Sequence, residues 1–242
     1  MIKINKQSPP IELLELKNAA MANNLSANEA YNTLSKPINK SIKEKVRQML
    51  ISEQGHLCAY CMRKIPDERV TDETNPGIYI EHWSARNAPD GSDAEGALNY
   101  NNMLVVCSGN QYDKTAKGKS RLTCDAKRGN RPLKVNPLND TTLETIYYKN
   151  DGSISARDKE IEDDLITKLN LNCSVDAVSL PKNRKETLRP IEDELGQYNE
   201  EVEIIARCKE LLAAFEHETD PKTPYVGIII WYLKDLLHTL DR

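Results

Sequence analysis

The chain has 242 residues, of which 39% are hydrophobic and 29% charged, as is ordinary for a globular protein with its own core. A formal net charge of −4 argues against a protein that binds nucleic acid over its whole surface. No apolar export segment opens the sequence, and the longest apolar run, YVGIIIWYL, is too short to span a bilayer. We therefore expect a cytoplasmic protein with no membrane partner, whose six cysteines stay reduced and either bind metal or pack in the core.

The first segment, residues 1–53, has the pattern of a helical region. Apolar residues recur at helical spacing in PPIELLELKNAAMANN, and the prolines suit a helix start. Ser26 and Glu29 have the spacing of a capping box at the start of a second helix. NKSIKEKVRQMLISEQ is again helical in pattern, and Gly55 supplies a stop.

The middle segment, residues 54–140, has a different composition, in which Gly, Pro, Asn, Asp and Cys are frequent. Two apolar runs in it, GIYIEHW and NMLVVC, have the length of strands. From Gln111 to Lys134 there are eight basic residues and two acidic ones, so this stretch carries +6 within an acidic chain. Such a local patch attracts phosphate groups, although Lys114, Lys117 and Lys119 also fit a solvated loop.

The last segment, residues 141–242, is expected to begin with a β-hairpin and to continue as three or more helices. Asn150, Asp151 and Gly152 form a strong turn sequence within TIYYKNDGSISA. The final helical run, TPYVGIIIWYLKDLLHTL, is apolar around most of its circumference, so it packs either in its own core or against a partner. Together the three segments predict an α+β fold.

Four cysteines of the middle segment are candidates for a metal site. Cys58 and Cys61 form a C-x-x-C pair that can grip one tetrahedral Zn²⁺, and Cys107 and Cys124 supply the remaining two ligands of a closed structural site. The alternatives are buried thiols that pack as small hydrophobes, or a redox pair, which would need a βαβ pattern that is absent. A metal also gives a thin, loop-rich segment the stability that it lacks.

Glu81 and His82 end the first predicted strand and are candidate catalytic residues. Taken alone, the pair is more simply explained as a buried hydrogen-bonded pair. Its companions change that balance: Asn102 precedes the second strand, and Asp125 directly follows Cys124 at the start of a predicted short helix, DAKRGN. Successive strand residues point to opposite faces, so Glu81 and His82 can share a site only if the strand bends there.

At these positions the sequence resembles the HNH endonucleases, the ββα-metal or His-Me finger class. Their zinc-stapled members contain C-x-x-C, an acidic residue with His, Asn-Leu, and a second cysteine pair whose last Cys precedes Asn, with Lys further on. The matching residues here are Cys58, Cys61, Glu81, His82, Asn102, Met103, Cys107, Cys124, Asp125 and Lys127. The resemblance covers about residues 50–138. It departs from the pattern where a basic insertion splits the second cysteine pair and where Asp125 replaces the commoner Asn or His.

The resemblance implies a fold and a role for each of the site residues. The fold is a zinc-stapled ββα-metal core flanked by N- and C-terminal helices. His82 is then the general base, Glu81 and Asp125 hold a catalytic Mg²⁺ or Mn²⁺, and Asn102 orients the His82 loop. Zn²⁺ on the cysteines stays structural. The residues implied to contact the phosphates of the substrate are Lys127, Arg128 and Arg131.

A longer match is with the PtuB-type HNH effectors of Septu antiphage systems. It is carried by PPIELLELK, LCAYCMRKI, YIEHWSARN, NYNNMLVVCSGN, TCDAKRGN and LKVNPL. That family works beside an SMC/ABC-like ATPase, PtuA, and, where the system is attached to a retron, beside a reverse transcriptase and its msDNA. The resemblance implies an antiphage nuclease whose helical segments dock on the ATPase. Two other functions stay open: a zinc-stabilised nucleic-acid-binding or adaptor module without catalysis, and a stand-alone restriction-type HNH nuclease.

Overall fold

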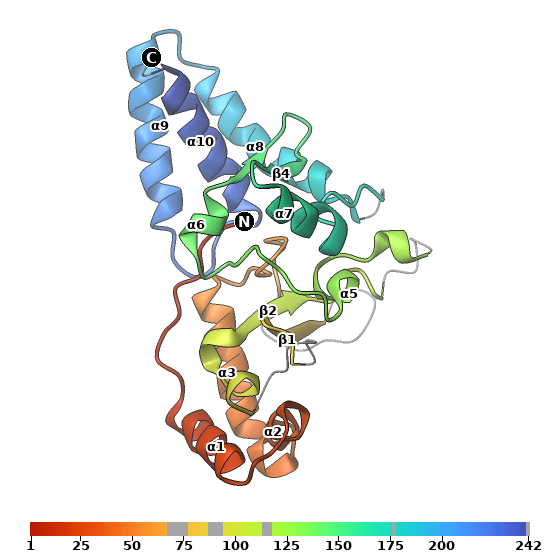
Figure 1. The fold of residues 1–242 in the computed structure, drawn as a ribbon. Coiled ribbons are helices and arrows are strands. Elements are labelled where there is room, and N and C mark those ends of the chain that lie inside the picture. Colours follow the sequence, from red (N-terminus) through yellow and green to blue (C-terminus); the bar gives the residue numbers. More distant parts are fainter. Residues whose placement is uncertain (67–76, 87–93, 113–117, 176–177, 241–242) are drawn as a thin grey trace.

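In the computed structural model of the chain, the described residues are 1–66, 77–86, 94–112, 118–175 and 178–240. They form a mixed α+β fold with two small antiparallel sheets, as the sequence predicts. Figure 1 shows α1 and α2 at the lower end, the sheet of β1 and β2 in the middle, and α8, α9 and α10 at the upper end. None of the helices in the described ranges is both long and apolar enough to cross a membrane.

Residues 1–53 are helical apart from their first ten residues. Ser26 Oγ accepts a hydrogen bond from the backbone N–H of Glu29, and the Glu29 carboxylate accepts one from the N–H of Ser26, so the predicted capping box is confirmed. Gly55 has a φ of +61°, which suits its predicted place at the helix stop. The elements are α1 (Ile11–Ala22), α2 (Ala27–Leu34), the 3₁₀ turn η1 (Pro37–Asn39) and α3 (Lys40–Glu53).

The middle segment is built on the two predicted strands, β1 (Ile78–His82) and β2 (Met103–Cys107). They pair antiparallel, with Ile78 opposite Cys107 and His82 opposite Met103. All five residues of β2 are buried, which fits its continuous apolar run. The other elements are α4 (Ala94–Ala97), η2 (Tyr100–Asn102), η3 (Lys119–Arg121), α5 (Cys124–Arg128) and α6 (Asp140–Leu143).

The last segment contains the predicted hairpin and helices. The hairpin strands β3 (Ile146–Tyr148) and β4 (Ile154–Ala156) pair antiparallel. The first helical stretch after the hairpin is a short α-helix that continues as a π-helical turn. The helical elements are α7 (Lys159–Asp163), η4 (Asp164–Lys168), α8 (Leu180–Leu195), α9 (Glu201–Glu216) and α10 (Val226–Leu240).

One hydrophobic core runs through all three segments. It includes Leu50 of α3, Val105 of β2 and Ile228 of α10, each fully buried. α10 packs against α9, α8 and β3, so much of its apolar surface is covered by the chain itself. Backbone hydrogen bonds also cross the segment limits, from Ile4 to Pro137 at 2.8 Å. The segments differ in composition, but they are packed as one body.

Candidate metal centre and active site

The four cysteines predicted to bind zinc meet at one buried point. Their sulfur atoms all lie within 4.8 Å of one another. The Sγ–Sγ distance is 3.8 Å for the pairs Cys58–Cys124, Cys61–Cys107 and Cys107–Cys124. Four thiolates at about 2.3 Å from a tetrahedral Zn²⁺ are separated by about 3.8 Å, so the cluster has the dimensions of a zinc site.

Tight turns bring the sulfurs together from three places in the chain. Cys58 accepts a backbone hydrogen bond from Met62 at 2.9 Å, and Met62 has a φ of +61°, which closes the first turn. The second turn follows Cys107 and depends on Gly109. Its φ is +60°, and a Cβ there would lie 2.1 Å from the carbonyl oxygen of Thr123. Only glycine lets these two backbones approach so closely beside Cys124.

The electrostatics of the cluster favour a bound cation. Burial raises the pKa of Cys58, whereas hydrogen bonds from the three neighbouring thiols lower the pKa of Cys61. The buried thiols thus act on one another's pKa values in opposite directions. A divalent metal favours their ionised forms, because it neutralises several thiolates at once. The residues present thus fit a structural metal such as zinc.

Glu81, His82 and Asp125 line one cavity of about 370 Å³ beside the cysteine cluster. Glu81 and His82 stand at the end of β1, and Asp125 comes from the first turn of α5, immediately after the metal-cluster residue Cys124. The two adjacent strand residues share the cavity even though strand alternation would separate them. Asp125, which is distant in sequence, therefore lines the same cavity as the neighbouring Glu81 and His82.

His82 is buried and held in one orientation. Its Nε2 lies 2.9 Å from the carbonyl oxygen of Ala97, and because a carbonyl only accepts, Nε2 carries the proton and Nδ1 keeps its lone pair. Burial, and to a lesser degree the charges of Arg86 and Arg128, lower the pKa of His82 to about 4. The imidazole is therefore neutral at pH 7 and able to accept a proton through Nδ1.

The carboxyl groups of Glu81 and Asp125 lie close enough that each changes the pKa of the other. Burial and the negative charge of Asp125 raise the pKa of Glu81 to about 8, against the opposing effect of Arg128. Burial likewise raises the pKa of Asp125. Two carboxyl groups that share a proton at neutral pH can release it to a divalent cation, which relieves their repulsion.

Asn102 fastens the loop that follows His82. Its Oδ1 accepts the N–H of Ser84 at 2.7 Å, and its Nδ2 donates to the carbonyl oxygens of Ser84 at 3.0 Å and Gly96 at 3.2 Å. The backbone of Asn102 also accepts the N–H of Trp83 at 3.0 Å. Three of these four bonds use the side-chain amide, so Asn102 positions residues near the cavity from outside it.

Arg128 is used within the fold. Its side chain is fully buried, and it forms an ion pair with Glu81. Its guanidinium group also donates to the carbonyl oxygens of His82 at 3.1 Å and Trp83 at 2.5 Å, and Nε donates to the carbonyl oxygen of Arg131 at 2.9 Å. These contacts clamp α5 to the end of β1 and leave the prediction of Arg128 as a phosphate contact untested.

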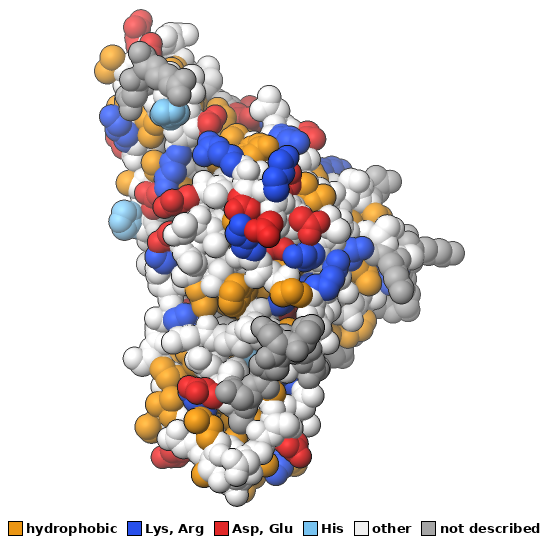
Figure 2. Space-filling view, viewed as in Figure 1, with side chains coloured by type: hydrophobic (Ala, Val, Ile, Leu, Met, Phe, Trp, Pro, Cys, Tyr) orange, Lys and Arg blue, Asp and Glu red, His pale blue; other side chains and the backbone are white. Residues whose placement is uncertain are grey.

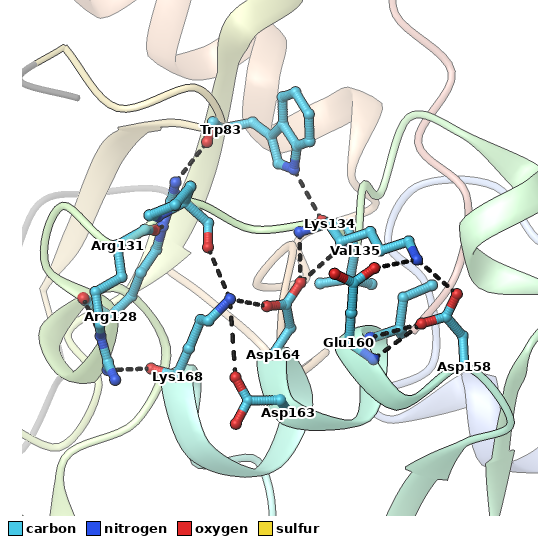
Figure 3. A network of polar contacts seen from close by, with 12 residues as sticks. Trp83, Arg128, Arg131, Lys134, Val135, Asp158, Glu160, Asp163, Asp164 and Lys168 are labelled. Carbon is cyan, nitrogen blue, oxygen red and sulfur yellow. Dashed lines mark hydrogen bonds and ion pairs between the residues drawn. The ribbon is translucent and has the colours of Figure 1, made fainter. Parts of the chain in front are cut away.

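Arg131 is also used within the fold, as Figure 3 shows. It donates to the backbone carbonyl of Lys168 at 2.9 Å (Figure 3). It also donates to the backbone carbonyl of Lys127 at 2.6 Å. In the same network, the buried Asp164 accepts the backbone N–H groups of Lys134 and Val135. These contacts join η4 to the chain after α5. They give Arg131 a structural task and leave its prediction as a phosphate contact untested.

The structure describes only some of the remaining basic residues of this stretch. Lys127 lies partly exposed on α5. Arg121 donates to backbone carbonyls, including that of Asn110 at 3.2 Å. Lys114 and Lys117, predicted to attract phosphates, lie outside the described residues, and so does the side chain of Lys119.

Sequence patterns did not predict the basic residues of the cavity, most of which come from the N-terminal helices. Tyr31 of α2, Lys43 and Arg47 of α3, and Arg86 line the cavity together with the acidic residues. The tyrosine ring touches the imidazole edge of His82, with 5.0 Å between centroids and an angle of 83°. Helical periodicity alone places Lys43 and Arg47 on one face of α3, but it does not show what that face meets.

Comparisons with protein-family models and with curated proteins give no match for this chain.

Proposed function

We propose that this chain is a metal-dependent endonuclease of the HNH class, which hydrolyses phosphodiester bonds of nucleic acid. The observation that carries the proposal is the convergence of Glu81, His82 and Asp125 on one cavity beside four clustered cysteines. The order of elements supports it, because two antiparallel strands are followed by α5, which packs against β2. A purely structural Glu–His pair has no need of a second buried carboxylate.

In this proposal His82 is the general base. The bond from Nε2 to Ala97 fixes the ring, and Nδ1 accepts a proton from the attacking water. A pKa of about 4 makes the imidazole a weak base in the empty cavity. The negative charge of a nearby phosphate raises that pKa, so the base becomes stronger when substrate is bound.

Glu81 and Asp125 would hold a Mg²⁺ or Mn²⁺ ion through carboxylate oxygens. When bound, such an ion supplies stabilisation of the charge that develops on the phosphate and the leaving oxygen. Arg128 keeps the Glu81 carboxylate beside Asp125, and Asn102 keeps the loop after His82 in place. The cysteine cluster, with zinc bound, fixes α5 and so places Asp125.

An antiphage role beside a PtuA-type ATPase, and beside a retron reverse transcriptase with its msDNA, is proposed from the sequence resemblance. The surface supports a protein partner at the lower end of the molecule, where hydrophobic side chains gather over α1 (Figure 2). The exposed large hydrophobic residues of α1 are Ile11, Leu14 and Met21. Such a face on an otherwise charged protein suits a docked partner.

The test is cleavage by the purified chain, alone and with a PtuA-type ATPase. Plasmid, single-stranded DNA and RNA are incubated with Mg²⁺ or Mn²⁺, and the His82→Ala variant is the matched control. We expect metal-dependent cleavage that the substitution abolishes. Cleavage that survives His82→Ala would remove the assignment of the base, and binding without cleavage under all conditions would favour the adaptor function.

A further inference from the structure

The cavity is lined by charged residues of both signs. Glu81 and Asp125 are acidic, whereas Lys43, Arg47 and Arg86, here called the basic wall, are cationic. A nucleic-acid strand brings a phosphate at every nucleotide, so the phosphate at the carboxylates has neighbours that also need positive charge.

Tyr31 organises the basic wall around a single ring. The guanidinium carbon of Arg86 lies 4.1 Å from the ring centroid, and Lys43 Nζ lies 5.4 Å from it. The edge of His82 meets the same ring. One aromatic side chain therefore fixes two cations relative to the proposed base.

Arg47 adds a buried donor to this wall. Its Nε and Nη2 bind the carboxylate of Glu44, whereas Nη1 is buried with no hydrogen-bond partner among the described residues. A buried guanidinium nitrogen without an acceptor is costly unless a ligand supplies one. Lys43 lies one helical turn before Arg47 on the same face of α3.

We propose that Lys43, Arg47 and Arg86 bind a backbone phosphate of the nucleic acid next to the one at Glu81 and Asp125. The inference rests on the proposed function for its choice of ligand. It makes α3 part of the substrate site, in addition to any role of the N-terminal helices in docking a partner.

The test is binding of a short labelled single-stranded DNA, its duplex, and an RNA of the same sequence in buffer without Mg²⁺ or Mn²⁺. The variants are Lys43→Gln, Arg86→Gln and the double variant Lys43→Gln/Arg47→Gln. Each phosphate contact that is lost should weaken binding about four- to sixfold at about 0.15 M salt. It should also reduce the slope of log K against log salt concentration by about 0.7 to 0.9.

Lys45→Gln is the matched control, because it removes the same charge from another face of α3, where Lys45 pairs with Glu12 at 2.8 Å. Thermal melting checks that every variant is folded, and the Lys43 and Arg86 single variants decide the matter if the double variant is unstable. Variants of the wall that bind as tightly as Lys45→Gln would overturn the inference, as would a wild-type chain that binds none of the probes. Cleavage lost only in His82→Ala, with wall variants binding normally, would leave the nuclease proposal intact while removing this one. Weakened binding by the wall variants of a chain that never cleaves would support this inference and remove the nuclease proposal.

Discussion

Replacing one cluster cysteine should remove the metal and most of the stability of the middle segment. In Cys107→Ser, the sulfur that lies 3.8 Å from those of both Cys61 and Cys124 is lost, so the site loses one of its four thiolate ligands. Structural zinc sites contribute on the order of 10–16 kcal/mol of apparent binding free energy in small domains. The total stability of a folded protein is only about 5–15 kcal/mol. The loss of tight zinc binding is therefore large enough to unfold the region around β1 and β2.

The assay combines metal analysis of the purified protein with thermal melting. We expect zinc in the wild-type chain, little or none in Cys107→Ser, and a much lower melting temperature for the variant. The control is Cys208→Ala, which removes a thiol that is equally buried but lies on α9, outside the cluster. Equal metal content in the wild-type chain and Cys107→Ser, or unchanged melting, would refute the reasoning.

Three further predictions concern the same region. Arg128→Met removes the donor to the carbonyl oxygens of His82 and Trp83 and to a Glu81 carboxyl oxygen. The free energy of unfolding in denaturant should therefore fall by about 3–5 kcal/mol, against under about 0.5 kcal/mol for Lys127→Met. Similar values for the two variants would argue against the clamp. Folding raises the pKa of Glu81 from 4.5 to about 8, so the metal-free protein binds more protons when folded and should lose stability as pH rises towards about 8. Mg²⁺ affinity, measured by calorimetry, should rise over the same pH range. An affinity that does not change with pH would count against a shared proton. Gly109→Ala should destabilise the protein by more than Gly118→Ala. Both residues have positive φ, but of the two only Gly109 has backbone close by, since a Cβ there would lie 2.1 Å from the carbonyl oxygen of Thr123. Equal melting temperatures for the two variants would contradict the close approach.

Local patterns predicted the elements and the metal cluster well, for identifiable physical reasons. The Ser26–Glu29 capping box, the turn at Gly152 and the apolar run of β2 depend on neighbouring residues, so sequence spacing is enough to find them. The cysteines were found because few arrangements of buried thiols in a loop-rich segment compete with a metal site.

The roles of the basic residues could not be predicted in the same way. Arg128 and Lys127 are adjacent in a five-residue helix, too short for periodicity to show that one is buried and the other partly exposed. Lys43 and Arg47 belong to a helix whose contact with the cavity depends on the packing of distant segments. Charge in a sequence indicates where cations are, whereas the fold decides which of them face a ligand.

The central claim is that the cysteine cluster places Asp125 beside Glu81 and His82 to form one metal-dependent site. The most direct measurement is a crystal structure of the chain with Mn²⁺, using anomalous scattering to locate each metal. We predict a zinc peak among the four cysteine sulfurs and a manganese peak bound by Glu81 and Asp125. A map with no peak at the two carboxylates, or with those side chains turned away from His82, would contradict the account.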